Sequence, residues 1–361
     1  MIADVLDGRA AVLPVPADDP HQSAALATAL RAGEDIDDAV GAVLSTSGTT
    51  GTPKGALLTA AALRAGAEAT HERLGGPGQW LLALPAHHVA GFQVLVRSVV
   101  AGTRPVAVPA SFEPEALTSA IAGMEPGRRY ASLVAVQLDK ALGDVAATRA
   151  LASLDAVLIG GGPMPAGVAE KASAAGISVI RTYGMSETAG GCVYDGVPLR
   201  GVEVRIAEDG RIELGGPTVA VGYRNPVTPD PFAEPGWFRT DDIGVLDAGV
   251  LRVLGRADDA ISTGGLTVLP GMVEAALATH PAVAECAVFG VADARLGQRV
   301  AAAVVTTPES SVTLAQLRSH VTETLPSSAA PRQLHLVDEL PRLGIGKIDR
   351  RELVRRFGES D

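Results

Sequence analysis

The chain has 361 residues, 47% of them hydrophobic and 20% charged, and its net charge is −11. This composition is typical of a globular protein of one to three domains with a sizeable core. The acidic balance, with no long run of lysines and arginines, argues against nucleic acid and against a membrane surface as partners. No apolar stretch is long enough to span a bilayer and the N-terminus lacks the basic start of a signal peptide, so we expect a cytoplasmic protein.

The first half of the chain alternates short apolar runs with segments of helical periodicity. The apolar runs predict strands at AVGAVL, QWLLAL, RPVAVPA, YASLVAV, LDAVLIG and SVIRTYG. Helical patterns lie between them, in TAAALRAGAEATHERLG, in VAGFQVLVR, and in EPEALTSAIAGM, QLDKALGDVAATRAL and MPAGVAEKASAAG. Strands that alternate with helices indicate an α/β fold whose mostly parallel sheet is covered by helices.

The pattern changes after Gly190, where short strands separated by tight turns predict a small antiparallel unit. GRADDAISTGG, residues 255–265, ends that unit, and a helix, two strands, a helix and a final strand follow. The polar, glycine-flanked RADD is the best candidate for a hinge between domains. We therefore expect a large domain over 1–255 and a small, mobile α+β domain over 256–361.

One stretch, STSGTTGTPKG at residues 45–55, combines glycines, small hydroxyl residues and a single lysine. Glycine lets backbone N–H groups approach an anion closely, hydroxyls add donors, and the lysine adds charge. A strand before the loop and a helix after it would place it where α/β proteins bind phosphate. The stretch is neither a Walker A loop nor a dinucleotide fingerprint, because the spacing of its glycines and Lys54 differs from both. The alternative interpretation is a polar surface turn.

STSGTTGTPKG resembles the phosphate loop of the adenylate-forming superfamily, which includes acyl-CoA synthetases, peptide-synthetase adenylation domains and luciferases. Those enzymes join a carboxylate to AMP and then pass the acyl group to a thiol. The resemblance covers residues 42–353 and implies ATP, Mg²⁺ and CoA as cofactors. The loop residues that it implies in ATP binding are Thr46, Ser47, Gly48, Thr49, Thr50, Gly51 and Lys54.

RTYGMSETAGG, residues 181–191, resembles a second signature of the superfamily. The resemblance implies that Tyr183 lies against adenine and that Gly184 and Thr188 also contact the nucleotide. It further implies that Glu187 ligates magnesium, and a hard cation does need oxygen ligands. Without this context, Glu187 would be a solvated residue at the start of a helix.

GWFRTDDIG, residues 236–244, resembles the segment whose aspartate holds the ribose hydroxyls, and that aspartate aligns with Asp242. Asp241 stands where glycine is usual, which adds a charge near the nucleotide. In GRADDAISTGG, the resemblance implies that Arg256 contacts ribose or phosphate. It also implies that Asp258 is the pivot of a rotation of the small domain.

LPRLGIGKIDRREL, residues 340–353, resembles the motif that carries the superfamily's catalytic lysine, here Lys347. The implied role of Lys347 is to stabilise charge as the carboxylate attacks the α-phosphate. Leu343 and Ile345 replace the small hydroxyl residues that are usual before the glycine. Lys347 and Glu187 are therefore the two predicted catalytic residues.

Two other stretches predict the acyl pocket. LPAHHVAGFQVLVRS aligns with a segment that borders the acyl group, and His88 matches its histidine. Arg97 or His88 is a candidate partner for a second, non-reacting carboxylate, and the alternative is that both are ordinary polar residues. LIGGGPMP would line the pocket beside the α-phosphate through Gly161 and Gly162.

Within the superfamily, the compact length, STGGLTVLP and the His88 motif most resemble the o-succinylbenzoate–CoA ligases of menaquinone biosynthesis. This resemblance implies an AMP-forming acid–thiol ligase that makes 2-succinylbenzoyl-CoA. Three alternatives stay open: a CoA ligase for another aryl or alkyl acid, an adenylation enzyme that loads a carrier protein, and a non-catalytic nucleotide-binding protein. The expected partners are small molecules, and a homodimer is only the common default for soluble enzymes.

Overall fold

A seven-stranded sheet is the centre of the computed structural model, which describes residues 1–46, 52–343 and 347–358. Its strand order is β4-β3-β5-β6-β7-β8-β9, parallel from β4 to β7 and antiparallel from there on. The strands are β3 (Gln79–Leu82), β4 (Val106–Ala107), β5 (Arg129–Val134), β6 (Ala156–Gly160), β7 (Val179–Met185), β8 (Gly190–Tyr194) and β9 (Val197–Pro198). The predicted mostly parallel sheet is confirmed.

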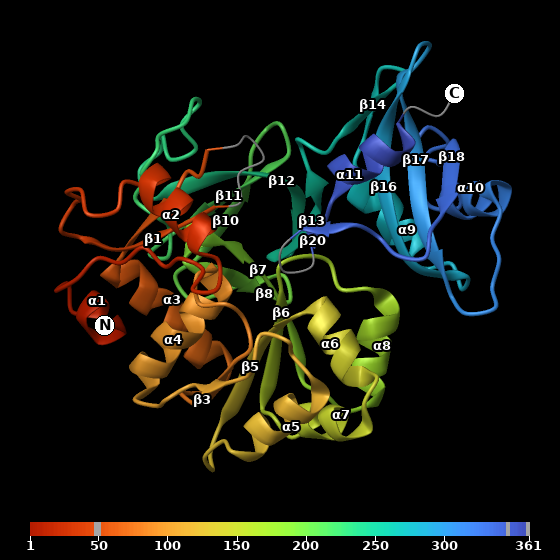
Figure 1. The fold of residues 1–361 in the computed structure, drawn as a ribbon. Helices are drawn as coiled ribbons and strands as arrows, with labels where there is room; N and C mark the ends of the chain where they lie inside the picture. Colours follow the sequence, from red (N-terminus) through yellow and green to blue (C-terminus); the bar gives the residue numbers. More distant parts are fainter. Residues whose placement is uncertain (47–51, 344–346, 359–361) are drawn as a thin grey trace.

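Helices cover both faces of this sheet (Figure 1). They are α3 (Ala60–Arg73), α4 (Val89–Ala101), α5 (Pro114–Ala122), α6 (Ala135–Leu142), α7 (Val145–Ala152) and α8 (Ala166–Ala174). Trp80 and Leu158 lie in a core that includes residues of α3 and α4, whereas Leu81 and Ile159 pack with α5 to α8. Because side chains alternate between two buried faces, the strands read as continuous apolar runs.

The predicted setting of the glycine-rich loop is wrong in one respect. The loop follows β1 (Val40–Leu44) as expected, but it leads into β2 (Ala56–Thr59), which pairs antiparallel with β1. Leu58 of β2 is fully buried, and Thr59 then caps α3 by accepting a hydrogen bond from Ala62 N at 3.0 Å. The loop therefore joins two strands of a separate small sheet before the helix begins.

The single helix predicted over 137–151 is also wrong, because the structure has α6 and α7 there. Gly143 and Asp144 separate the two helices. The Asp144 carboxylate accepts a hydrogen bond from Ala147 N at 2.8 Å, which is an N-cap that starts α7. The apolar periodicity continues across this break and does not reveal it.

The remaining strands form smaller sheets. The predicted antiparallel unit is confirmed as β10 (Glu203–Ile206), β11 (Arg211–Gly215), β12 (Trp237–Asp247) and β13 (Val250–Arg256). A five-stranded sheet follows, with β14 (Ile261–Thr263), β15 (Leu266–Val268), β16 (Val283–Asp293), β17 (Gly297–Thr306) and β18 (Gln333–Leu336). Around it lie α9 (Pro270–Leu277), α10 (Leu314–Thr322), the hairpin of β19 (Arg342–Leu343) and β20 (Lys347–Ile348), and α11 (Arg350–Phe357).

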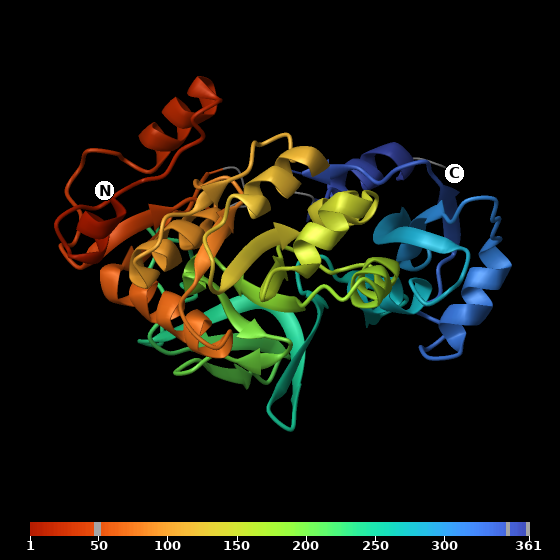
Figure 2. The same ribbon diagram turned by 90° about the horizontal axis from the view of Figure 1, so that it is seen from below.

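The proposed boundary after residue 255 follows the change of sheet, because β13 ends at Arg256 and β14 begins at Ile261. Figures 1 and 2 show the C-terminal elements gathered at one side of the seven-stranded sheet. Two short helices, α1 (Ile2–Leu6) and α2 (Pro20–Ala29), start the chain, and α2 stands out from the body in Figure 2. Within the described ranges, no helix is long and apolar enough to cross a membrane.

Candidate functional site

The turn between β7 and β8 carries four of the predicted site residues. A short 3-10 helix, η1 (Ser186–Thr188), fills this turn. Position 184 must be glycine, because a Cβ on Gly184 would lie 2.0 Å from the carbonyl oxygen of Gly190. The Thr188 hydroxyl donates to the same oxygen at 2.8 Å and accepts from Met185 N at 3.0 Å. Thr188 thus holds the turn in this structure, and its contact with a nucleotide stays a prediction.

Glu187 projects from the turn into a buried position. It is 8% exposed, and its Oε1 accepts a hydrogen bond from the Tyr223 hydroxyl at 2.6 Å. Burial raises the pKa of the Glu187 carboxyl above its ordinary value, while the Tyr223 hydrogen bond and the charge of Lys54 act in the opposite direction. A carboxylate removed from water is costly to the fold on its own, but it suits a site that receives a cation.

Two described residues flank the centre of the glycine-rich loop. The Lys54 Nζ lies 5.3 Å from the centroid of the Tyr223 ring. The Thr46 Oγ1 is buried without a hydrogen-bond partner among the described residues. The Ser186 hydroxyl donates to the Ser45 carbonyl at 3.5 Å, which brings the start of the loop beside η1. The other predicted loop residues lie outside the described part of the chain: Ser47, Gly48, Thr49, Thr50 and Gly51.

The structure brings three other predicted nucleotide residues together at β12. The Tyr183 hydroxyl donates to Asp242 Oδ2 at 2.7 Å, and burial together with Asp242 raises the pKa of this phenol. Arg256 Nη1 lies 3.5 Å from Asp242 Oδ1. Asp241 pairs instead with Arg211 and lies 3.5 Å from Arg256. The contact with Tyr183 therefore favours Asp242 over Asp241 as the ribose-binding candidate.

These groups fit a magnesium-bound nucleotide. Magnesium in nucleotide sites is usually held by one or two carboxylates together with substrate phosphates. In the described ranges, no cluster of three or more His, Cys, Asp or Glu side chains could hold a metal without such help. Glu187 offers the carboxylate, Lys54 offers a cation for phosphate, and Thr46 offers a buried hydroxyl that a ligand would satisfy.

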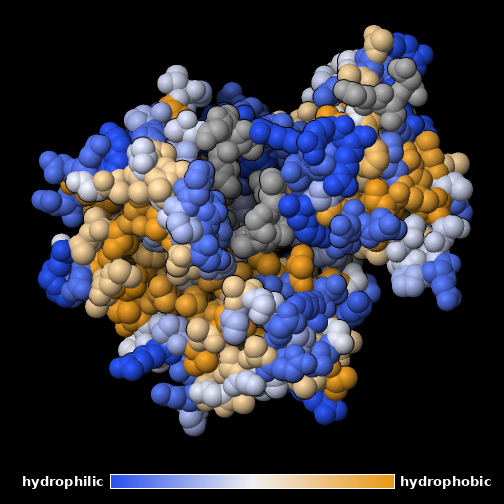
Figure 3. All heavy atoms as spheres, viewed as in Figure 1, coloured by the Kyte–Doolittle hydropathy of each residue, from blue (hydrophilic) through white to orange (hydrophobic). Residues whose placement is uncertain are grey.

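The predicted catalytic lysine lies on the C-terminal side of the molecule. Lys347 begins β20 and pairs with Leu343 of β19, and its side chain lies outside what the structure describes. Arg350 follows at the start of α11 and anchors this hairpin, donating to Glu274 at 2.6 and 2.8 Å and to Val288 O at 3.1 Å. Figure 1 shows β20 at the junction with the seven-stranded sheet, and Figure 3 shows a hydrophilic surface over α11 beside it.

The predicted hinge residue is paired within its own segment. Arg256 donates two hydrogen bonds to the Asp258 carboxylate, each 2.8 Å long. Ala257 N donates to Asp241 O at 2.8 Å, which ties the segment to β12. These contacts hold the start of the linker against β12. The hinge itself stays a prediction.

Three of the predicted acyl-pocket residues lie at the ends of two elements, the N-terminus of α4 and the C-terminal end of β6. His88 is the N-cap residue of α4, half-buried, with its ring centroid 4.3 Å from that of His87. Burial, and then His87, lowers the pKa of His88 below its ordinary value of 6.5, which disfavours the positively charged imidazole. Gly161 has a φ of +84°, which favours glycine, and a Cβ on Gly162 would meet open space. The backbone at the end of β6 is therefore accessible to a ligand.

Arg97 is buried in the core on the side of α4 that faces β8. It is 4% exposed, and among the described residues no carboxylate acts on it. Its Nη2 donates to the Tyr194 hydroxyl at 3.2 Å, its guanidinium carbon lies 4.8 Å from the centroid of the Trp80 ring, and its Nε has no partner. A buried cation without a counterion is costly, so Arg97 is suited to receive an anionic group.

His71 contacts Trp80 beside Arg97, and its titration should make the stability of the fold depend on pH. It accepts a hydrogen bond from Trp80 Nε1 at 3.2 Å, and burial, with a smaller effect of Arg97, lowers its pKa from 6.5 to about 4. The folded protein therefore disfavours protonated His71, and stability is lost as the pH falls from 6.5 towards 4. We expect His71→Gln, which keeps an acceptor for Trp80, to reduce the fall in Tm over this range. Thermal unfolding at several pH values measures it, and an equal fall in both proteins would contradict it.

Residues 222–225 form a strap that no sequence motif predicted. Arg224 N donates to Gly55 O at 2.8 Å, and Asn225 Nδ2 donates to Pro53 O and to Ala29 O, both at 2.8 Å. The strap therefore ties the end of the glycine-rich loop to the end of α2. No local pattern in the sequence could reveal it, because its partners lie more than a hundred positions away.

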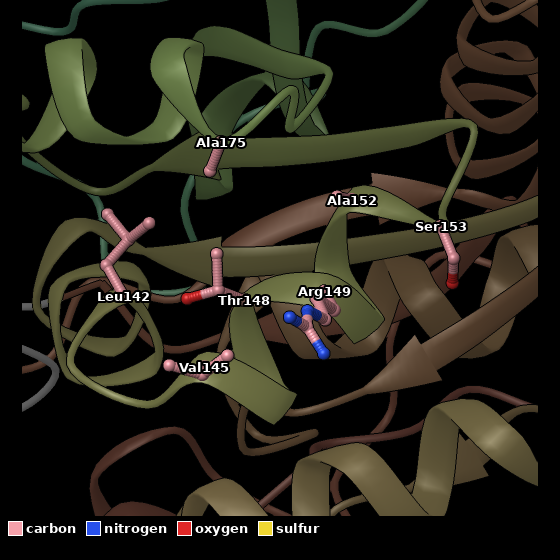
Figure 4. Close-up of a pocket in the computed structure, with 7 residues that line it drawn as sticks. All are labelled: Leu142, Val145, Thr148, Arg149, Ala152, Ser153 and Ala175. Atoms are coloured by element: carbon pink, nitrogen blue, oxygen red, sulfur yellow. The ribbon is translucent and has the colours of Figure 1, made fainter.

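A shallow surface hollow of about 560 Å³ lies away from these residues, between α6, α7 and the end of α8 (Figure 4). Thr148, Arg149 and Ala175 are on its wall, and it contains none of the predicted site residues. It combines one arginine with small and apolar side chains. The candidate site is therefore the one built around Glu187, Tyr183 and Asp242, and not this hollow.

Comparison with known proteins identifies the site's context. The family model described as AMP-binding enzyme matches residues 9–224, and the model described as AMP-binding enzyme C-terminal domain matches residues 272–347. The chain belongs to the AMP-binding enzyme family. The resemblance stated from the motifs is confirmed at this level, and the two matches lie on either side of the proposed hinge.

Relatives within the AMP-binding enzyme family agree with one another. A protein of Mycobacterium tuberculosis called "Probable 2-succinylbenzoate--CoA ligase" is 65% identical over 349 residues, which are 95% of this chain and 91% of that one. The o-succinylbenzoate CoA synthetase of Bacillus subtilis, in complex with the acyl-adenylate intermediate OSB-AMP, has a TM-score of 0.75 and 31% identity, covering 87% of this chain and 69% of that one. A structure of the same synthetase with ATP and magnesium ion also has a TM-score of 0.75 and 31% identity, over 89% of this chain and 72% of that one.

Proposed function

We propose that this chain is an AMP-forming ligase that makes 2-succinylbenzoyl-CoA from 2-succinylbenzoate, ATP and CoA. The observation that carries the proposal is the 65% identity with the mycobacterial relative of that name over 95% of this chain. The pathway that it implies is menaquinone biosynthesis. The residue roles below are part of the proposal.

In the first half-reaction, a carboxylate oxygen of the acid attacks the α-phosphorus of ATP and pyrophosphate leaves. Lys347 stabilises the charge that develops on the α-phosphate. Lys54 and the glycine-rich loop bind the departing phosphates, and Asp242 holds the ribose beside Tyr183. When bound through Glu187, magnesium neutralises phosphate charge.

In the second half-reaction, the thiolate of CoA attacks the acyl carbon, the bond between that carbon and the phosphate oxygen breaks, and AMP leaves. The acyl group is held covalently by AMP, so no nucleophilic side chain is needed. Rotation of the small domain about Asp258 would withdraw Lys347 and open the path for the thiol. The carbonyl and amide groups around Gly161 and Gly162 line the acyl site.

The second carboxylate of 2-succinylbenzoate needs a positively charged partner, and Arg97 can be that partner. Arg97 is a buried guanidinium that lacks a carboxylate partner among the described residues, whereas burial lowers the pKa of His88 and disfavours its charged form. Of the two candidates, Arg97 is therefore the better source of positive charge. We assign it to the non-reacting carboxylate, reached directly or through water.

Arg97→Met tests this assignment, because methionine keeps an unbranched apolar stem and removes the charge. We expect the KM for 2-succinylbenzoate to rise roughly 10–100-fold, the range for a hydrogen bond to a charged group. The KM for 3-benzoylpropionate, which lacks the ring carboxylate, should hardly change. Steady-state kinetics with both acids measures the difference, and an equal loss for both would remove Arg97 from substrate recognition.

The proposed function is tested with purified protein, Mg·ATP and CoA, and with 2-succinylbenzoate, benzoate or a medium-chain fatty acid in parallel. AMP and acyl-CoA are detected by mass. We expect AMP and 2-succinylbenzoyl-CoA with the first acid and little product with the others. Efficient turnover of another acid would keep the adenylate chemistry and overturn the substrate. AMP formation only with a carrier protein as acceptor would favour the carrier-loading alternative.

Location and assembly are part of the same proposal. A cytoplasmic location suits an enzyme whose substrates are small and charged and whose described helices do not cross a membrane. A homodimer is proposed only as the common default for such enzymes. Light scattering at several protein concentrations measures the assembly directly.

A further inference from the structure

We propose that Tyr223 is a positioning residue that fixes the metal-binding carboxylate of Glu187 and the cation of Lys54 relative to one another. The inference rests on the proposed function and deepens it, because it concerns how the nucleotide site is assembled. Tyr223 belongs to the strap at residues 222–225. It carries none of the roles that the motifs assign.

The contact with Glu187 is direct and sheltered. The Tyr223 hydroxyl donates to Glu187 Oε1 at 2.6 Å, and the two side chains are 9% and 8% exposed. A single strong donor on one oxygen fixes the plane of a carboxylate and leaves its other oxygen for a cation. Ala220 N, three residues before Tyr223, also donates to the backbone oxygen of Glu187 at 2.9 Å. Tyr223 thus holds the side chain of Glu187, and the segment just before the strap holds its backbone.

The same ring supports the cation of the phosphate loop. Lys54 Nζ lies 5.3 Å from the centre of the Tyr223 ring, within the range of a cation–π contact. The backbones are held together as well, because Tyr223 forms a β-bridge with Ala56 and Leu57 N donates to Gly222 O at 2.9 Å. Lys54 therefore lies half-buried next to the Tyr223 ring.

The position of Tyr223 is itself fixed by packing. Its ring meets Phe232 edge to face, with centroids 5.1 Å apart and an angle of 80° between the rings. Phe232 in turn packs on Phe238 of β12, at 4.9 Å between centroids. A rigid ring with its hydroxyl on a carboxylate and its face towards an ammonium sets the spacing between the metal ligand and the phosphate-binding lysine.

Tyr223→Phe removes only the hydroxyl and tests the inference. The affinity for a non-hydrolysable ATP analogue is measured by calorimetry at several Mg²⁺ concentrations. We expect the apparent dissociation constant for Mg²⁺ to rise roughly 10–100-fold, the usual cost of losing a group that orients a metal ligand. The KM for CoA should stay unchanged. Tyr223→Leu, which also removes the ring face, should in addition weaken analogue binding at saturating Mg²⁺.

Tyr130→Phe is the matched control, because it also removes a tyrosine hydroxyl that is hydrogen-bonded, to Leu74 O and Gly76 O, away from the site. Tyr130→Phe should leave the apparent dissociation constant for Mg²⁺ unchanged. If Tyr223→Phe had the same apparent dissociation constant for Mg²⁺ as the wild-type protein, the inference would be overturned and the proposed function would stand. Loss of folding in Tyr223→Phe, seen as a lost thermal transition, would assign the residue to stability and would also overturn it. Failure of the wild-type protein to bind the analogue in the presence of Mg²⁺ would overturn the proposed function as well.

Discussion

Replacing Lys347 by alanine is expected to slow formation of the acyl-adenylate roughly 10²–10³-fold, the cost of removing one preorganised charge from a transition state. The reason is that the α-phosphate gains charge while the acid oxygen attacks, and Lys347 is the cation assigned to that step. Transfer of the acyl group from AMP to CoA should stay near its wild-type rate. This split arises because the second half-reaction takes place after the lysine has withdrawn.

The two half-reactions are measured separately. Release of pyrophosphate without CoA reports the first, and synthesised acyl-adenylate supplied with CoA reports the second. Lys171→Ala is the control, because Lys171 is a surface lysine with its side chain 67% exposed and should affect neither step. Equal losses in both half-reactions of Lys347→Ala would contradict a specific role in adenylation.

Glu187→Gln is expected to lower turnover roughly 10²-fold and, at the same time, to raise the Tm at neutral pH. The loss of activity follows from removing the carboxylate assigned to magnesium. The gain in stability follows from burial, which raises the pKa of Glu187 in the folded state. A group of this kind stabilises the fold fully below its unfolded pKa, and that stability is lost as the pH rises through the folded pKa. Glutamine does not ionise, so Glu187→Gln should not lose stability as the pH rises.

The gain in Tm should be largest at neutral pH, where the ordinary carboxyl is ionised and its burial opposes folding. It should shrink as the pH falls towards ~4.3, the pKa of an ordinary glutamate, because the carboxyl is then neutral in wild-type protein as well. Calorimetry between pH 4 and 8 measures the change in Tm at both ends of this range. Glu68→Gln, on the exposed side of α3, is the control. A lower Tm in Glu187→Gln would make the carboxylate a structural group, and full activity would remove it from the metal site.

The parts of the fold that could be predicted are those with a local signal. Val157, Leu158 and Ile159 of β6 are buried on both faces of a helix-covered sheet, so the strand stands out as an apolar run. The break between α6 and α7 could not be predicted from periodicity, because a capping side chain at Asp144 makes it. The strand β2 was missed because its partner β1 lies across the glycine-rich loop, and pairing of that kind leaves little mark on a segment of four residues.

The candidate site divides in the same way. Tyr183, Gly184 and Glu187 are predictable because they share one contiguous motif. The partners that arrange them are not, since Tyr223 lies 36 positions from Glu187 and Asp242 lies 59 positions from Tyr183. The close contact between Gly184 and Gly190 explains why the motif needs its glycine. Long-range hydrogen bonds therefore contribute the geometry, and the local motif contributes the chemistry.

The central claim is that this member of the AMP-binding enzyme family activates 2-succinylbenzoate as an adenylate and transfers it to CoA. A single-turnover experiment tests it most directly: excess protein is mixed with Mg·ATP and 2-succinylbenzoate without CoA, quenched, and analysed by mass, and a second sample is chased with CoA. The account predicts 2-succinylbenzoyl-AMP and pyrophosphate in the first sample, and 2-succinylbenzoyl-CoA and AMP in the second. Formation of ADP and phosphate, or of no adenylate while another acid is adenylated, would contradict it.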